Sequence, residues 1–255
     1  FIIFCARIVV KKREKCMKTI DYNELDIISY NHNSGSFAEI DKCIFNGEIY
    51  ALKRFTNGKY LNGKRRKISE LSSINDSHLI TPKFWVKNEE GKNQYLTKFC
   101  YGDPLEFEKN TNVVAKLKHA KNLIEKMHSY KIIHGDLNIS NLLFSGDEPF
   151  IIDFDNVSLN NSNVDISSLN DYSADYIKRL GINKGLDVYL FNLLTYAILN
   201  ETDYYCVRSN VLAKKYGVFD FKDGIKLCNL FSLEKGYSDG DYLIDMISNE
   251  DVKSI

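Results

Sequence analysis

The apolar residues of this chain follow two different patterns along its length. Up to about residue 99 they form short runs separated by turn residues, which is typical of β-strands. Asn46-Gly47 lies between two such runs, and Asn-Gly in that position is a strong signal for a β-hairpin. Beyond residue 104 the apolar positions recur every three or four residues, which indicates helices. The pattern therefore predicts an α+β fold with strands first and helices afterwards.

In the first part the pattern predicts a five-stranded antiparallel sheet with one helix. The strands are expected at 25–30, 37–45, 50–55, 82–87 and 94–99, and the helix at 65–74. Gly102 and Pro104 mark the connector that leads out of the last strand.

The second part is expected to be mainly helical. The first helix shows an apolar stripe at Val113, Leu117, Ala120, Leu123, Ile124 and Met127. Residues 187–199 form a second, strongly apolar helix, and 243–247 suggest a short one near the end. The polar stretch between Asp155 and Asp171 is expected to be a loop.

A short stretch between these helices combines polar residues suited to phosphoryl transfer. Two apolar strands on either side of the turn at 145–149 predict a hairpin with two acids and an amide at one end. Asp136 is suited to accept a proton from a hydroxyl, while Asn141 and Asp153 offer hard oxygens to Mg²⁺ bridging the phosphates of ATP. Oxygen ligands without His or Cys favour Mg²⁺ over zinc. A His-x-Asp sequence alone is common in ordinary turns, so the hypothesis depends on all these features occurring together.

This combination resembles the catalytic loop and the metal-binding loop of the protein kinase superfamily. The matching residues are His134-x-Asp136-x4-Asn141 and Asp153-Phe154-Asp155. The resemblance covers roughly residues 21–250 and implies ATP and Mg²⁺ as cofactors. It also implies a bilobal domain over 18–255, preceded by an extension at 1–17 that lies outside the fold. Its parts are an N-lobe (18–99), a hinge (98–104) and a C-lobe (103–255).

The resemblance places further residues around the phosphates. Asn33, Gly35 and Ser36 occupy the position of the glycine-rich loop that approaches the phosphates, although only the middle glycine is kept. Taken alone, this stretch would more often be an ordinary β-turn.

Ala51 and Lys53 stand where the family has V-A-I-K, which implies that Lys53 contacts the α and β phosphates. Glu70, on the predicted helix, would hold Lys53 by an ion pair. Without such a partner, Lys53 would be an ordinary solvated lysine on a strand.

The connector after the last strand corresponds to the family's hinge, where adenine binds. The resemblance implies adenine contacts by the Lys98 carbonyl and the Cys100 amide, with Thr97 at the gatekeeper position. Asp103 lies near the position that contacts ribose, and Leu143 is a further expected nucleotide contact. An ordinary strand-to-helix loop is the alternative for this segment.

Some positions match the family and others depart from it. Asp187 stands where the family's central helix begins with an aspartate that braces the catalytic loop, and Ser173-Ala174-Asp175 stands at the position of A-P-E. Gly135 replaces an arginine that pairs with a phosphorylated loop, so activity is expected not to depend on such phosphorylation. Asn138 replaces a lysine of Ser/Thr kinases, and Asp155 replaces glycine, as in aminoglycoside and choline phosphotransferase relatives.

Composition limits the partners. The formal net charge is zero, so no nucleic-acid partner is expected. The six cysteines are scattered, which indicates neither a disulfide framework nor a zinc site and favours a cytoplasmic location. The apolar run at 1–10 is too short to span a bilayer and precedes its positive charges, so neither membrane insertion nor a secretory signal is expected. Met17 is an alternative start just before the domain.

Three functions are compatible with these motifs. The leading hypothesis is an ATP- and Mg²⁺-dependent kinase that phosphorylates Ser or Thr hydroxyls of a protein substrate. The second is a small-molecule phosphotransferase of the aminoglycoside or choline kinase type, with the same catalytic residues. The third is a non-catalytic pseudokinase that acts as a binding module. Retention of Lys53, Glu70, Asp136, Asn141 and Asp153 argues against the third.

Overall fold

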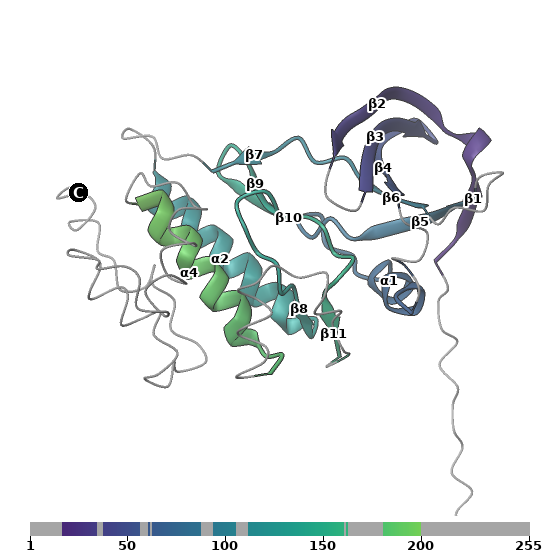
Figure 1. The fold of residues 1–255 in the computed structure, drawn as a ribbon. Coiled ribbons are helices and arrows are strands. Elements are labelled where there is room, and N and C mark those ends of the chain that lie inside the picture. Colours follow the sequence, from purple (N-terminus) through teal and green to yellow (C-terminus); the bar gives the residue numbers. More distant parts are fainter. Residues whose placement is uncertain are drawn as a thin grey trace, which may run out of the picture.

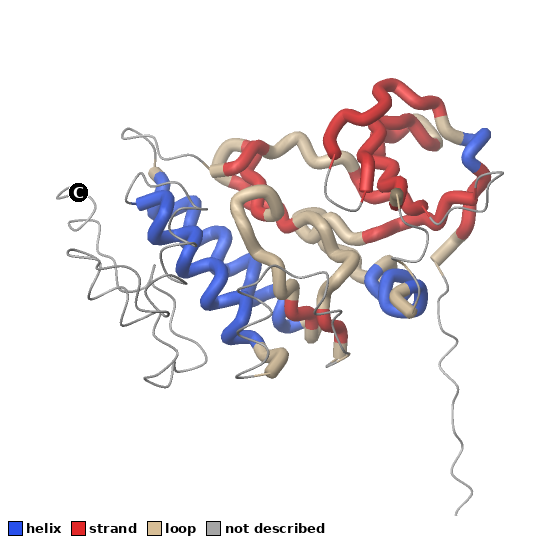
Figure 2. The backbone as a smooth tube through the Cα atoms, viewed as in Figure 1, coloured by secondary structure: helices blue, strands red, loops and turns tan. Residues whose placement is uncertain are grey.

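The computed structural model describes residues 17–34, 38–56, 61, 63–87, 94–105, 112–160, 162 and 181–199. Figure 1 shows the strands of the first part at one end of the molecule and two long helices side by side at the other. Figure 2 shows that loops and short strands fill the region between them. The mixed α+β class predicted from the sequence is confirmed.

The first part forms a six-stranded sheet in the order β1-β5-β6-β4-β3-β2. Its strands are β1 (Thr19–Asp21), β2 (Asp26–Ser34), β3 (Ala38–Phe45), β4 (Glu48–Phe55), β5 (Pro82–Lys87) and β6 (Gln94–Lys98). The prediction of five antiparallel strands is wrong for this sheet, because β1 adds a sixth strand that pairs in parallel with β5. A strand of three residues is too short to show a period in the sequence.

The hairpin predicted at Asn46-Gly47 joins β3 to β4. Both turn residues have positive φ, 50° for Asn46 and 77° for Gly47, as a two-residue hairpin turn requires. The resulting register sets Lys53 of β4 opposite Ile40 on one side and Tyr95 of β6 on the other. Lys53 therefore lies in an inner strand of the sheet.

Each face of the sheet has its own small apolar cluster. One cluster contains Leu52 and Leu96, and the other contains Phe55, Ile68, Trp85 and Tyr95. Ile68 belongs to helix α1 (Arg65–Leu71), so this helix covers the second face. Side chains alternate between faces along a strand, and Lys53 reaches over the Phe55 ring on the face that α1 covers.

The described residues of the second part contain two helices and five short strands. The helices are α2 (Val113–Ser129) and α4 (Lys184–Leu199). The strands are β7 (Asp103–Pro104), β8 (Ile132–Ile133), β9 (Leu142–Ser145), β10 (Glu148–Ile151) and β11 (Ser158–Leu159). β10, β9 and β7 form one sheet, and β11 pairs with β8. A helix that is apolar on all sides is expected to be buried, and nearly every residue of α4 is buried, with its buried apolar side chains in the largest core cluster.

Some predicted features fall on residues that the structure does not describe. They are Gly35 and Ser36 of the phosphate loop, most of the polar loop after Asp155, Ser173-Ala174-Asp175 and the helix at 243–247. Residues 1–16 of the predicted extension are also outside the description, whereas Met17 is buried in the cluster with Tyr95.

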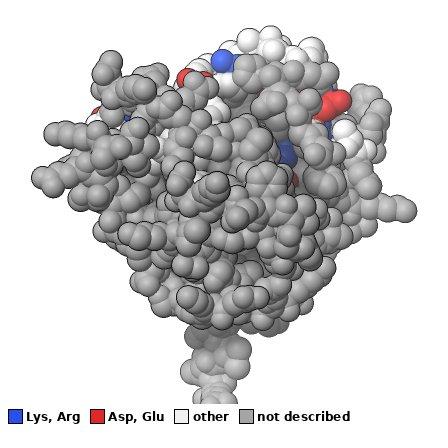
Figure 3. Space-filling view, turned by 60° about the vertical axis from the view of Figure 1, so that its left-hand side comes forward, with Lys and Arg blue, Asp and Glu red and all other residues white. Residues whose placement is uncertain are grey.

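Charges of both signs occur on the described surface. In the view of Figure 3, Lys and Arg side chains are interspersed with Asp and Glu on the part of the surface that is not grey. Across the described elements, no helix is long and apolar enough to cross a membrane.

Candidate active site

The β9–β10 hairpin brings the predicted polar residues to one end. In its antiparallel register Leu142 lies opposite Ile151, so the residue before β9 is next to the residue after β10. The Ile152 amide accordingly donates to the Asn141 carbonyl at 3.0 Å. Asn141 precedes β9 and Asp153 follows β10, so the predicted amide and acid are held at the same end of the hairpin.

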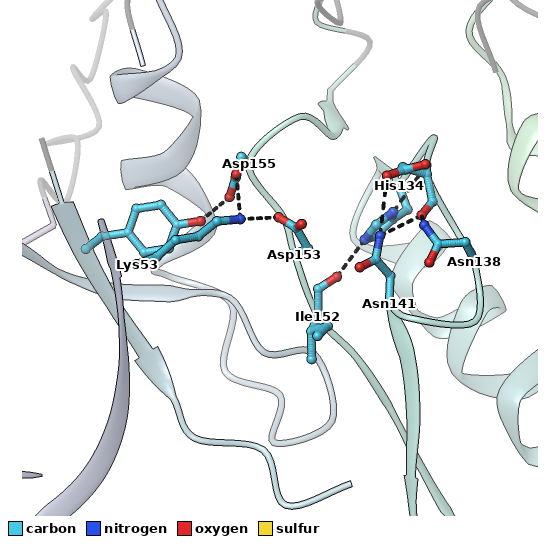
Figure 4. Close-up of polar contacts among 9 residues, drawn as sticks. Lys53, His134, Asn138, Asn141, Ile152, Asp153 and Asp155 are labelled. Carbon is cyan, nitrogen blue, oxygen red and sulfur yellow. Dashed lines mark hydrogen bonds and ion pairs between the residues drawn. The ribbon is translucent and has the colours of Figure 1, made fainter. Parts of the chain in front are cut away.

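His134 links the loop before β9 to the segment after β10. Its Nε2 lies 2.8 Å from the Ile152 carbonyl, and the Asp136 amide donates to its Nδ1 at 3.3 Å. These contacts require a neutral ring with the proton on Nε2. The ring is almost fully buried and meets Phe154 edge to face, with the ring centroids 5.3 Å apart. Figure 4 shows this bridge between the two segments.

Asp187, in the first turn of α4, holds the same loop from the other side. Its carboxylate accepts from the amides of His134 at 2.9 Å and Gly135 at 2.7 Å, and it lies 2.9 Å from Nε2 of His128. The side chain is fully buried. Gly135 has φ of 76°, a conformation that glycine adopts without strain. The predicted bracing of the loop by Asp187 is confirmed.

Two asparagines set the conformation around Asp136. Nδ2 of Asn141 donates to the Asp136 carbonyl at 2.9 Å and lies 3.4 Å from its Oδ2. Asn138 closes the loop internally, because its Nδ2 donates to the Asp136 carbonyl and its Oδ1 accepts from the Ser140 amide at 2.8 Å. Within the described part of the chain, Oδ1 of Asn141 makes no hydrogen bond, so it remains an available oxygen ligand.

Lys53 joins the sheet to the segment that follows β10. Its Nζ lies 2.6 Å from Asp153 Oδ1 and 2.7 Å from Asp155 Oδ2. Figure 4 shows the lysine extending from its strand towards both carboxylates. The structure thereby brings together a lysine and an acid that are separated by 100 residues in the chain.

The ion pair predicted between Lys53 and Glu70 is not formed. The Glu70 carboxylate instead pairs with Arg66, one turn earlier on α1, at 3.0 Å. The Glu70 side chain is 40% exposed, whereas Lys53 is largely buried between two acids. A largely buried ammonium needs nearby compensating charge, and Asp153 and Asp155 supply it.

Asp155 and Tyr95 are site residues that the sequence reasoning did not identify as such. The Tyr95 hydroxyl donates to Oδ1 of Asp155, and Lys53 binds the other oxygen of the same carboxylate. In the sequence, Asp155 stands out because it replaces the glycine that follows Asp-Phe in the kinase family. No sequence motif marks Tyr95 in the same way. Its role depends on the cross-strand register that pairs it with Lys53.

Lys53, Asp153 and Asp155 shift one another's pKa values. Burial works to lower the pKa of Lys53, but the charges of Asp153 and Asp155 outweigh it and raise that pKa. Burial works to raise the pKa of Asp153, but the charge and the hydrogen bond of Lys53, together with smaller contributions, outweigh it and lower that pKa. The pKa of Asp155 is raised, first by burial and then by the charge of Asp153. Asp153 is therefore the more readily ionised of the two acids.

The oxygen donors around Asp153 fit Mg²⁺. Within the described residues, no group of three or more His, Cys, Asp or Glu side chains is arranged to hold a metal. Mg²⁺ does not require one, since it usually keeps several waters and binds through one or two carboxylates together with substrate phosphates. The Asp153 carboxylate, 40% exposed, and the oxygen of Asn141 fit this type of site.

The residues predicted to contact adenine and ribose lie on β6, on β7 and on the connector between these two strands. Thr97 is opposite Ala51 in the sheet, and Asp103 is opposite Phe144. A Cβ on Gly102 would lie 3.0 Å from the Leu143 Cβ, so this glycine allows the connector to pass directly over Leu143. The structure therefore brings the predicted hinge next to Leu143. The Lys98 side chain is paired with Glu48.

Residues 75–179 match the model of a family described as the phosphotransferase enzyme family (APH). The resemblance to kinase-like phosphotransferases is confirmed over this segment. It contains Asp136, Asn141, Asp153 and Asp155, whereas Lys53 precedes it. No curated protein matches the chain.

Proposed function

We propose that this protein is a kinase-like enzyme that transfers the γ-phosphate of Mg²⁺-bound ATP to a hydroxyl group. The single observation that carries the proposal is the convergence of Asp136, Asn141 and Asp153 at one end of the β9–β10 hairpin, with Lys53 reaching Asp153 from the sheet. The family match, which covers Asp136, Asn141 and Asp153, supports the phosphotransferase class.

Each side chain has a role in this proposal. Asp136 orients the acceptor hydroxyl and takes its proton. Asn141 and Asp153 hold Mg²⁺, which when bound offsets the negative charge of the phosphates. Lys53 binds the α and β phosphates, and the residues around Thr97, Lys98 and Cys100 bind adenine. Phosphoryl transfer requires mainly positioning and charge compensation, and the bracing by Asp187 and His134 supplies a rigid loop for it.

Removal of the charge on Asp136 tests the catalytic role. Asp136→Asn is expected to slow phosphate transfer at least about a hundredfold, the low end of general-base effects. The affinity for Mg²⁺-ATP should change little, because Asp136 faces the nucleophile and not the metal. Turnover is measured with radiolabelled ATP, and affinity with a fluorescent nucleotide. Asp147→Asn is the matched control, since Asp147 lies in the exposed turn at the other end of the hairpin, 3.8 Å from Lys116.

The results separate the alternatives. Equal turnover by the parent and Asp136→Asn would reject Asp136 as the base. Nucleotide binding without turnover in either protein would instead support a pseudokinase.

The acceptor is the second part of the proposal, and a small hydroxyl-bearing molecule is favoured. Ser/Thr kinases carry a lysine at the position of Asn138, and here the amide of Asn138 is used inside the loop at 3.1 Å from the Asp136 carbonyl and 2.8 Å from the Ser140 amide. Asn138 therefore does not supply the cation that Ser/Thr kinases offer to the γ-phosphate from this position.

Protein Ser/Thr phosphorylation is the second candidate. The braced loop beneath α4 favours it, because Asp187 occupies the place of the aspartate that begins the central helix of protein kinases. Amino-sugars, choline and generic protein substrates should be compared under the same conditions with Mg²⁺ and radiolabelled ATP. Labelling of proteins alone would overturn the small-molecule proposal.

A further inference from the structure

The two acids that hold Lys53 differ in their access to solvent. The Asp153 side chain is 40% exposed, and the Asp155 side chain is only 4% exposed. An exposed carboxylate is able to bind a metal together with phosphates and water. A buried carboxylate is confined to its protein partners. The two acids are thus suited to different tasks.

Asp155 is held from two sides. One carboxylate oxygen accepts from Tyr95 of β6, and the other lies 2.7 Å from Nζ of Lys53 on β4. Tyr95 and Lys53 lie opposite each other on adjacent strands, so both bind the Asp155 carboxylate from the same place on the sheet. Tyr95 is itself fixed by the aromatic cluster, with its ring 5.6 Å from Phe55 and 6.0 Å from Trp85. The Asp155 carboxylate therefore has a rigid support.

Lys53 requires a partner that remains when a metal binds. An ammonium has three N–H donors, and in the structure two of its contacts are to Asp153 and Asp155. If Asp153 turns to Mg²⁺, Lys53 keeps its contact with Asp155 and has two donors left for phosphate oxygens. Glu70 does not take this place, because its carboxylate is paired with Arg66 on the outer side of α1.

We propose that Asp155, supported by Tyr95, is the positioning residue that aims Lys53 at the phosphates of ATP. It performs the task that the family resemblance implied for Glu70. Asp155 does not itself touch the nucleotide but acts through Lys53. This inference rests on the proposed function, because it concerns how the same site holds ATP.

A double-mutant cycle tests the coupling between Asp155 and Lys53. Asp155→Asn should slow phosphate transfer at least about tenfold, because a charge-assisted hydrogen bond no longer positions the ammonium. In a Lys53→Met background the same Asp155→Asn change should have almost no further effect, since the group it positions is absent. A merely structural role for Asp155 would give the same loss in both backgrounds. Asp155→Glu should recover part of the rate by retaining the charge.

Nucleotide binding provides a readout that does not depend on turnover. The ³¹P resonances of the α and β phosphates of bound Mg²⁺-ADP should shift in Asp155→Asn towards their positions in Lys53→Met. Glu70→Gln should have a smaller effect than Asp155→Asn on both rate and resonances.

A second variant covers the case in which Asp155→Asn does not fold. Tyr95→Phe keeps the ring packing and removes only the bond to Asp155, so it should lower the rate in the parent and not in Lys53→Met. Tyr50→Phe is its matched control, because the Tyr50 hydroxyl also binds a carboxylate, Glu48, at 2.9 Å, and that carboxylate is also paired with a lysine, Lys98.

The outcomes test the role of Asp155 separately from the proposed kinase function. If the parent transfers phosphate but the cycles are additive, or if Glu70→Gln is more damaging than Asp155→Asn, the role of Asp155 is overturned while the kinase assignment stands. If the parent neither binds nucleotide nor transfers phosphate, both are overturned.

Discussion

At the scale of single residues, Asp187 shows how one buried carboxylate sets the shape of a loop. It accepts from two consecutive amides, those of His134 and Gly135, and faces His128. Buried amides need partners, and a loop of this shape offers them none of its own. The carboxylate from α4 therefore holds the turn that leads to Asp136.

Asp187→Asn should destabilise the protein by about 1–3 kcal/mol, because the new amide nitrogen would face a backbone N–H and leave a buried donor without a partner. Urea denaturation measures the change in the free energy of unfolding. Asp147→Asn should change it by less than about 1 kcal/mol, since Asp147 is 69% exposed and its ion pair with Lys116 is at the surface. Similar stability of the two variants would contradict the bracing role.

At the scale of elements, a short segment before β5 ties the sheet to the hairpin. The Ile151 amide donates to the His78 carbonyl, and the Ile80 amide donates to the Ile151 carbonyl, both at 2.9 Å. Asp76, at the start of this segment, accepts from the His78 amide at 3.0 Å and pairs with Lys126 of α2 at 2.6 Å. The segment thereby sets where β10, and the Asp153 that follows it, lie relative to the sheet.

The Asp76 pair predicts an acid-sensitive contribution to stability. Burial works to raise the pKa of Asp76, but the hydrogen bonds from Lys126 and the His78 amide outweigh it and lower that pKa. A carboxyl with a lowered pKa in the folded state adds stability above its unfolded pKa, about 3.9 for Asp, and loses it as the pH falls through the folded value. Asp76→Asn should therefore lower Tm at pH 7 and have a smaller effect below about pH 4. Thermal melts of both proteins across this range measure the difference, and an equal loss at every pH would contradict the argument.

At the scale of the whole molecule, the site is made from both parts of the chain. Lys53 and Tyr95 come from the sheet, and Asp153 and Asp155 come from the segment after β10. A ligand that binds across them is expected to stabilise the folded protein as a unit, by mass action.

Mg²⁺-ATP at a hundred times its Kd should add about 2.7 kcal/mol to the free energy of unfolding and raise Tm. Asp153→Ala should remove the part of the Tm shift that depends on Mg²⁺, because it removes the charged ligand. Nucleotide without Mg²⁺ serves as the control in both proteins. The ATP assignment fails if millimolar Mg²⁺-ATP leaves the Tm of the parent unchanged.

The sequence by itself determined those features that depend on neighbours along the chain. The hairpin at Asn46-Gly47, helix α2 and the β9–β10 hairpin follow from turn chemistry and from the spacing of apolar residues, both of which are local. Once the β9–β10 hairpin forms, its register alone places Asn141 beside the segment that carries Asp153.

Only the tertiary structure decided which acid Lys53 binds. The family resemblance implied Glu70 as the partner, but an ion-pair partner is chosen by distance and burial after folding. Asp155 is buried against Lys53 and Tyr95, whereas Glu70 has Arg66 one turn away on an exposed side of its helix. Likewise, β1 joined the sheet through a parallel pairing with β5, which lies more than sixty residues further along the chain. Contacts between such distant residues leave no period in the sequence, because they depend on how whole elements pack.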